Sequence, residues 1–448
     1  MASAADQMAQ SINLAKFAKA TDLKKRLWFT IGALIVFRLL SYVPLPGVDP
    51  TALGLLSEQT KGGVLDFFNT FSGGALSRMS LIALGIMPYI TASIVVQLST
   101  SLSPTLAAIK KEGESGRKRL NQYTRYGTVL LTAVQGFFIA RGLEAGGAVA
   151  EPGTVFVVAA IISLIGGTMF LMWIGEQITS RGIGNGVSLI IMAGIVAHLP
   201  TTLFNLLEGG RSGSVDPVRL VGIIVAVIGL ILLICFMERA QRRILIQYPK
   251  RQTQRGMQAD RSHLPLKINT AGVIPPIFAS SLLLMPLTIS QFAGQRVAGE
   301  SAWGDFIITL NQYLQHGSPV YMALYAAGII FFSFFYTAVV FNPEETADNL
   351  KRYGGFIPGI RPGKNTETYF DYVLTRITVI GAAYLTFICV VPEYLVTALQ
   401  IPFYLGGTSL LIVVNVTMDT VTQIQSHLLA HQYGDLIKKA KLKGGRLR

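Results

Sequence analysis

Hydrophobic residues along the chain gather into ten long runs, which polar or charged stretches separate. A helix of about 20 apolar residues is long enough to cross the hydrocarbon core of a bilayer. The runs lie at 24–43, 79–99, 126–143, 154–176, 186–206, 217–237, 270–293, 319–341, 373–392 and 403–425. The pattern therefore predicts an all-α polytopic membrane protein with ten transmembrane helices.

The stretch between residues 61 and 99 departs from this pattern. Its first part, Gly63–Leu76, is apolar but too short to span a bilayer, and Gly73 and Gly74 interrupt it. We expect this part to enter the membrane without crossing it. The second part is long enough to span but carries Pro88 in its middle and polar side chains at membrane depth. We interpret the two parts as the plug and the gate of a pore.

The order of the runs favours two related halves. A Gly- and Ser-rich linker at 207–216 divides the chain into residues 1–206 and 217–428, with a tail at 429–448. Each half contains five runs, and an odd number of spans predicts that the halves are inverted in the membrane. The chain is therefore expected to form two pseudo-symmetric five-helix halves.

Interrupted segments at corresponding positions of two halves mark the transport site in many duplicated membrane proteins. The second run of the first half contains Pro88, and the second run of the second half contains Pro275 and Pro276. Both runs also carry amide and hydroxyl side chains, which can serve simply as contacts between helices. The matched prolines predict that the site lies between these two segments.

Composition and charge support a membrane protein with a defined orientation. The chain has 448 residues, a mean hydropathy of +0.49 and only 14% charged residues, which excludes an ordinary soluble fold. If the N-terminus is cytoplasmic, 31 of the 38 lysines and arginines fall on the cytoplasmic side of the ten spans. This bias predicts that both termini are cytoplasmic. Arg38, near the outer end of the first run, is expected to extend to the membrane interface.

The sequence offers little for catalysis or metal binding. Cys235 and Cys389 lie inside hydrophobic runs without CxxC spacing, and His427 and His431 have no further ligand nearby. We therefore expect no enzyme activity, no cofactor and no metal site. Two other classes of protein remain open, namely a secondary transporter of a small solute and a scaffold without a conducting path.

Five long motifs, in order along nearly the whole chain, carry a specific resemblance. They are MSLIALGIMPYITASIVVQLS, GEQITSRGIGNGVS, LPLKINTAGVIPPIFASSLL, FNPEETADNLKRYGGFIPGIRPG and PFYLGGTSLLIVV. In these motifs the chain resembles the SecY family, the central subunit of the bacterial protein-conducting channel.

The resemblance implies an hourglass pore between the two halves, with three groups of functional residues. A ring of aliphatic side chains narrows the pore at Ile86, Ile90, Val187, Ile191, Ile277 and Ile412. The plug consists of Val64, Leu65, Asp66, Phe67, Phe68, Asn69, Thr70, Phe71 and Ser72, within a region of about 62–76. A lateral gate between spans 2 to 3 and 7 to 8 is lined by Thr91, Ser93, Gln97 and Asn269.

The same resemblance implies the task and the partners. The chain is expected to pass unfolded polypeptides across the bacterial cytoplasmic membrane and to release signal peptides and nascent membrane helices sideways into lipid. The implied partners are the SecE and SecG subunits, the SecA motor ATPase, and the ribosome with its RNA, which supply the energy and the substrate. Docking of these partners is expected on the basic cytoplasmic loops, at Arg242, Arg243, Arg251, Arg255 and Arg361.

Overall fold

The computed structural model describes most of the chain. The described residues are 21–49, 69, 71–212, 216–248, 251–253, 256–258, 261–283, 313, 318–399 and 406–444. Residues 64–68 and Thr70 of the predicted plug, and Arg255 of the predicted docking set, lie outside them.

Each of the ten hydrophobic runs contains a helix in the described part of the chain. These helices are α3 (Thr21–Leu40), α6 (Met87–Leu102), α8 (Glu114–Ala145), α9 (Thr154–Arg181), α10 (Gly186–Arg211), α11 (Pro217–Arg239), Ile274–Leu283, α14 (Pro319–Val340), α16 (Lys364–Leu399) and α17 (Gly407–Gly444). Two shorter helices, α7 (Pro104–Lys111) and α15 (Pro343–Arg352), lie in the charged loops. Among the described residues, six helices are long and apolar enough to cross a membrane, or seven if α6 and α7, bent by 101°, form one span.

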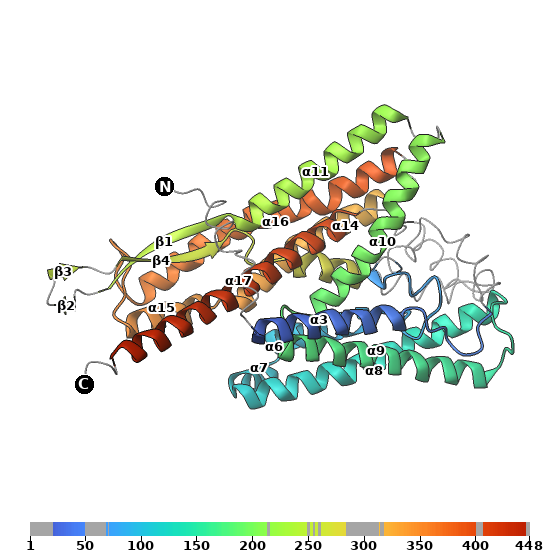
Figure 1. Cartoon of the computed structure of the whole chain (residues 1–448), viewed down its shortest axis with the longest axis horizontal. Coiled ribbons are helices and arrows are strands. Elements are labelled where there is room, and N and C mark those ends of the chain that lie inside the picture. The colour runs from blue at the N-terminus through green and yellow to red at the C-terminus, as the bar shows by residue number, and fades with distance from the viewer. Residues whose placement is uncertain are drawn as a thin grey trace.

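The helices form two groups that α10 connects (Figure 1). In one group α8 packs against α6 and α9, and α3 packs against α9. In the other group α16 packs against α14 and α17, and α11 packs against α17. Because α10 contacts both α9 and α17, it lies at the junction of the two groups. The main hydrophobic core draws residues from both groups.

In both proline-containing runs the helix begins later than the sequence pattern predicts. In the first, residues 71–86 form mainly turns, and α6 begins only at Met87, so that Pro88 lies in its first turn and not in its middle. In the second, the helix begins at Ile274, directly before the paired prolines. Proline is tolerated in a first turn because the N–H that it lacks would have no partner inside the helix. The prolines therefore start helices within these runs.

The basic loop after α11 contains β-structure that the all-α prediction did not include. Strand β1 (Gln241–Gln247) pairs antiparallel with β4 (Arg261–Lys267), and β2 (Arg251–Thr253) pairs with β3 (Gly256–Gln258). Ile244 of β1 and Leu266 of β4 join a second hydrophobic cluster with residues of α15 and α16, and Gln247 exchanges two backbone hydrogen bonds with Phe356. These contacts join the two predicted docking loops into one body.

Candidate functional site

All six predicted ring residues belong to the main hydrophobic cluster or pack against it. They arrive from four segments: the start of α6, the start of α10, the helix Ile274–Leu283 and the start of α17. Five of them are at most 7% exposed, and the sixth, Val187, is partly buried against the same cluster. The Asn185 side chain caps α10 by accepting from the backbone N–H groups of Val187 and Ser188, which fixes the start of the helix that carries Val187 and Ile191. That the ring narrows a pore remains a prediction.

Three of the four predicted gate residues lie together on α6. The Gln97 amide donates to the Ser93 hydroxyl over 3.4 Å, and the Thr91 hydroxyl donates to the Met87 carbonyl over 3.1 Å. Ser93 and Gln97 line a cleft of about 360 Å³ that also touches α7, α8 and α14. Spans 2, 3 and 8 therefore meet at this cleft, where the sequence resemblance implies a lateral gate.

The cleft has lining residues that the sequence argument missed. On α6 they are Val96 and Thr100, on α7 Lys110, on α8 Arg117, Leu120, Asn121 and Thr124, and on α14 Tyr336, Val339 and Val340. The lining positions of α6 and of α8 both follow the spacing i, i+3, i+4, i+7, which places each set on one helix face. This spacing is visible in the sequence and could have identified both faces.

Asn269, the fourth predicted gate residue, is engaged elsewhere. Its amide donates to Glu238 Oε1 at the end of α11 over 2.5 Å and to the Gly272 carbonyl over 3.1 Å. Glu238 is 7% exposed and Asn269 is 4% exposed, so the pair is buried. An exposed ion pair between Lys267 and Asp419, at 3.8 Å, links β4 to α17. Glu238 directly follows the hydrophobic run 217–237, and nothing in the sequence pattern indicated its burial.

The described end of the predicted plug is densely bonded. Phe71 and Ser72 are buried, and Asn69 Oδ1 accepts a hydrogen bond from the Ser77 N–H over 3.0 Å. Arg38, which we expect to extend to the membrane interface, is half-buried. Its guanidinium group donates to the Gly73 carbonyl over 2.6 Å. A buried carbonyl outside a helix needs such a donor, because no water reaches it.

The predicted docking arginines divide between two loops of one body. Arg242 and Arg243 are exposed on β1, and Arg361 is exposed in the loop between α15 and α16. The backbone of Arg251 belongs to β2. The second hydrophobic cluster holds β1 and α15 together, so these loops form a joint basic surface.

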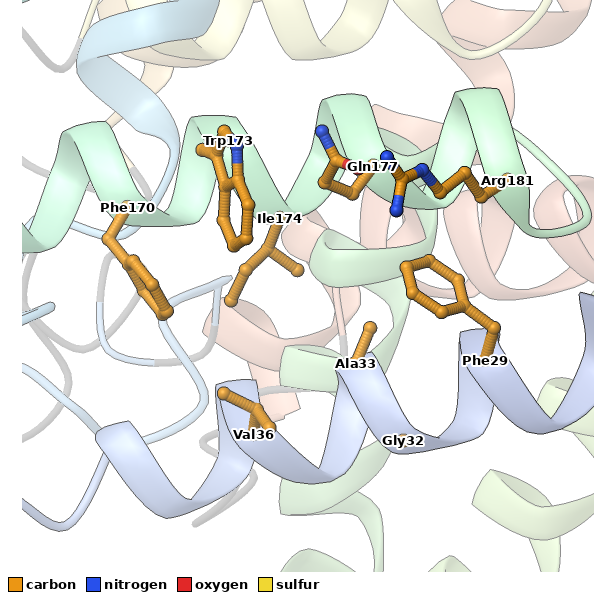
Figure 2. A pocket seen from close by; sticks show the side chains of 9 residues that line it. All are labelled: Phe29, Gly32, Ala33, Val36, Phe170, Trp173, Ile174, Gln177 and Arg181. Carbon is orange, nitrogen blue, oxygen red and sulfur yellow. The ribbon is translucent and has the colours of Figure 1, made fainter.

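A larger cavity of about 610 Å³ lies between α3 and α9. Figure 2 shows Val36 of α3 facing Phe170 and Trp173 of α9 at one end, and Phe29 of α3 facing Gln177 and Arg181 at the other. It includes none of the predicted pore, plug, gate or docking residues. Its lining is mostly apolar, and Trp173 is 53% exposed, as expected for a surface that faces lipid or another helix.

Comparison with known proteins decides the family. The SecY family model matches residues 80–421. The chain belongs to the SecY family. A SecY protein translocase subunit from Escherichia coli strain K12 is 54% identical over 428 residues, which cover 94% of this chain and 96% of that protein.

Two solved structures show the same fold as this SecY-family chain. The first was solved in a study of how the SecY plug domain stabilises the closed state of the translocation channel and maintains a membrane seal. It has a TM-score of 0.63 at 19% identity, over 90% of this chain and 92% of that chain. The second is Sec61 in the canine ribosome–channel complex, with a TM-score of 0.60 at 16% identity and the same coverage. The prediction of a polytopic helical membrane protein with the SecY architecture is confirmed.

Proposed function

We propose that this chain is the channel-forming subunit of a Sec translocase, which passes unfolded polypeptides across the membrane and releases apolar segments sideways into lipid. The observation that carries the proposal is that six aliphatic side chains from four separate segments share one buried hydrophobic cluster. In a chain of the SecY family, these six side chains form the closed constriction of the pore. The family supports this function over transport of a small solute.

An aliphatic ring suits a channel for chains of any sequence. Ile and Val side chains offer no hydrogen bonds, so an empty constriction excludes water and ions by dewetting. When a polypeptide enters, the same side chains surround it without preferring any residue type. Selection is therefore steric, and the reaction requires no covalent chemistry.

The cleft beside α6 provides the sideways exit. It lies between α6, α8 and α14, and polar side chains from α6 and α8 line part of it. A segment exposed to lipid there partitions by its hydrophobicity, since Leu at a helix centre is favoured by about 0.3 to 0.6 kcal/mol and Arg or Lys is disfavoured by about 2.5 to 3.5 kcal/mol. Thr91, Ser93, Gln97 and Asn269 form the lateral gate. Ser93 and Gln97 line the cleft itself, and Asn269 lies at the Glu238 contact.

Residues 64–72 form the plug on the outer side. The study named above assigns a sealing role to the plug domain of a SecY protein, which supports the same role here. Residues 1–206 and 217–428 form the two halves, the linker at 207–216 joins them, and 429–448 form a cytoplasmic tail. The bias of basic residues supports cytoplasmic termini in a bacterial inner membrane.

Energy and substrates come from partners on the cytoplasmic side. Arg242, Arg243, Arg251, Arg255 and Arg361 form the docking surface for the SecA motor ATPase and for the ribosome, including its RNA. A solved Sec61 channel in complex with a ribosome supports docking of this kind. The SecE and SecG subunits complete the channel within the lipid. Contacts of arginine with RNA phosphates weaken steeply as salt rises.

The ring is tested by placing one polar side chain in it. Ile412→Asn puts an amide at a fully buried ring position of α17, whereas Val421→Asn puts the same amide at a 40% exposed position of the same helix. We expect Ile412→Asn to raise the ion conductance of the resting channel in planar bilayers about tenfold, equivalent to about 1.4 kcal/mol. Val421→Asn is expected to leave the conductance unchanged.

The same preparation tests the activity itself. Proteoliposomes with the complete translocase and its motor ATPase are expected to take up an unfolded secretory protein in an ATP-dependent manner. Equal resting conductance of the Ile412→Asn and Val421→Asn variants would contradict the proposal that the aliphatic ring seals the pore. Saturable uptake of a small solute without protein uptake would favour the transporter.

A further inference from the structure

Two arginines from distant parts of the chain bind one backbone carbonyl. Arg38, near the end of α3, places Nη1 2.6 Å from the Gly73 oxygen, and Arg78, in the turns before α6, places Nη2 2.9 Å from it. A carbonyl oxygen has two lone pairs. Both are therefore used by charged donors, which form stronger hydrogen bonds than neutral ones.

The side chain of Tyr42 lies between the two arginines. Arg38 Nη2 donates to the Tyr42 hydroxyl over 3.1 Å, and the two guanidinium carbons lie 5.0 and 4.3 Å from the centre of its ring. Arg78 Nε also donates to the Ser41 carbonyl over 3.2 Å. The electron-rich ring face partly compensates the repulsion between the two cations. We call Arg38, Arg78 and Tyr42 the Gly73 anchor.

The backbone at Gly73 is shaped for this contact. Gly73 has a φ of +70°, which side chains other than glycine rarely adopt, and an added Cβ would lie 3.2 Å from Gly194 Cα of α10. The Gly73 peptide is therefore wedged between the end of α3 and α10. Glycine permits the close approach, and the arginines supply the hydrogen bonds that the turn lacks.

The position of the anchor along the chain suggests its role. Gly73 directly follows the proposed plug, and the same stretch leads to Ile86 and Ile90 of the proposed ring. We propose that Arg38 and Arg78 are positioning residues that hold the Gly73 peptide against α3 and α10 and thereby keep the resting channel sealed. This inference rests on the proposed function.

The chemistry of the anchor fits a contact that can be released. Arginine side chains are long and flexible, so they can leave the carbonyl without a change in the backbone that carries them. Arg38 also donates to the Tyr42 hydroxyl and Arg78 to the Ser41 carbonyl, so each guanidinium group keeps a second polar partner after release. An apolar contact of the same strength would have no such alternative partner.

The test measures the ion conductance of the complete translocase in planar bilayers without substrate. The variants are R38Q, R78Q and the double variant R38Q/R78Q, with R219Q, an exposed arginine of α11, as the matched control. We expect each single variant to raise the resting conductance only about threefold, because the other arginine still binds the Gly73 carbonyl. The double variant should raise it at least about tenfold, since loss of a charge-assisted hydrogen bond shifts a conformational equilibrium by about one to two powers of ten. R219Q is expected to match the wild type.

Two further readouts separate positioning from simple destabilisation. The double variant R38K/R78K keeps the charges and a donor but loses the planar fork, so its conductance should lie between those of the wild type and R38Q/R78Q. The apparent unfolding temperature in detergent should differ little between the two double variants. If R38Q/R78Q does not fold, the single variants and R38K/R78K decide the outcome.

The inference is overturned if the folded Gln variants conduct as little as the wild type. It is also overturned if conductance rises only in proportion to lost thermal stability across all variants. Failure of the proposed function looks different, because the wild-type translocase would then not take up an unfolded protein at all. The two failures are therefore distinguishable in one preparation.

Discussion

The stretches that precede the two interrupted helices have similar backbone conformations, but side chains of opposite charge stabilise them. Residues 71–86 lead into α6, and residues 268–273 lead into the helix Ile274–Leu283. Each stretch is non-helical for most of its length, contains a glycine with positive φ and ends at a helix with proline in its first turn. Non-helical backbone within a membrane protein is tolerated only where other groups satisfy it.

The groups that satisfy the two stretches differ. In the first, the cations Arg38 and Arg78 donate to a backbone carbonyl. In the second, the carboxylate of Glu238 accepts from the side chain of Asn269, which in turn donates to the carbonyl of Gly272. One break is therefore held by basic residues and the other by an acidic residue. The two helices therefore begin in a similar way, but different side chains stabilise the non-helical stretch before each of them.

The largest effect is expected from the packing of the first stretch. A Cβ at Gly167 of α9 would overlap the Leu81 carbonyl oxygen, whereas a Cβ at Gly381 of α16 would lie 2.8 Å from the Ile268 oxygen in the second stretch. We expect Gly167→Ala to lower the free energy of unfolding by about 3 kcal/mol and Gly381→Ala by about 1 kcal/mol, because overpacking against backbone cannot relax through a rotamer change.

Denaturant titration in mixed micelles measures both packing variants. Gly166→Ala is the matched control, since no atom lies within 4 Å of its added Cβ. Alanine there should be neutral or stabilising by up to about 1 kcal/mol, from helix propensity. If Gly167→Ala and Gly381→Ala lowered the free energy of unfolding equally, the two stretches would not differ in how tightly they pack.

An intermediate effect is expected at the buried hydrogen bond between Glu238 and Asn269. Glu238→Ala leaves the buried Asn269 amide with one partner fewer, which should cost about 2 kcal/mol of stability. Glu238→Gln keeps an oxygen acceptor and should recover at least half of that loss. The same titration measures both variants, with Glu208→Ala at an exposed position of α10 as the control. A stability unchanged in Glu238→Ala would mean that the second stretch needs no anchor.

The smallest effect is expected where the two interrupted helices touch. The Ser281 hydroxyl donates to Met87 Sδ over 3.8 Å, and thioether sulfur is a weak acceptor. Hydrogen bonds between membrane helices average about 0.6 kcal/mol, so Ser281→Ala should change stability by no more than about that amount. Ser280→Ala, whose hydroxyl bonds within its own helix, is the control. If Ser281→Ala lowered stability by more than about 1.5 kcal/mol, the contact between these helices would be too strong for a gate that must open.

Features that depend on local sequence were predictable. The hydrophobic runs predicted where the ten helices lie. The matched prolines, Pro88 in one half and Pro275 and Pro276 in the other, located the two interrupted segments. The family followed from motifs that the sequence displays in order. The face of α6 that lines the cleft also follows from helical spacing.

The tertiary structure decided how distant residues satisfy each other. Arg38 and Gly73 are 35 positions apart in the sequence, and Glu238 and Asn269 are 31 positions apart, so no local sequence pattern predicts either contact. Hydropathy likewise cannot show where a helix begins inside an apolar run, because turns and helix there are equally apolar. The sequence by itself determined which segments enter the membrane, since that depends on transfer free energy residue by residue. Only packing decided which polar groups meet, because each buried group must find a partner in three dimensions.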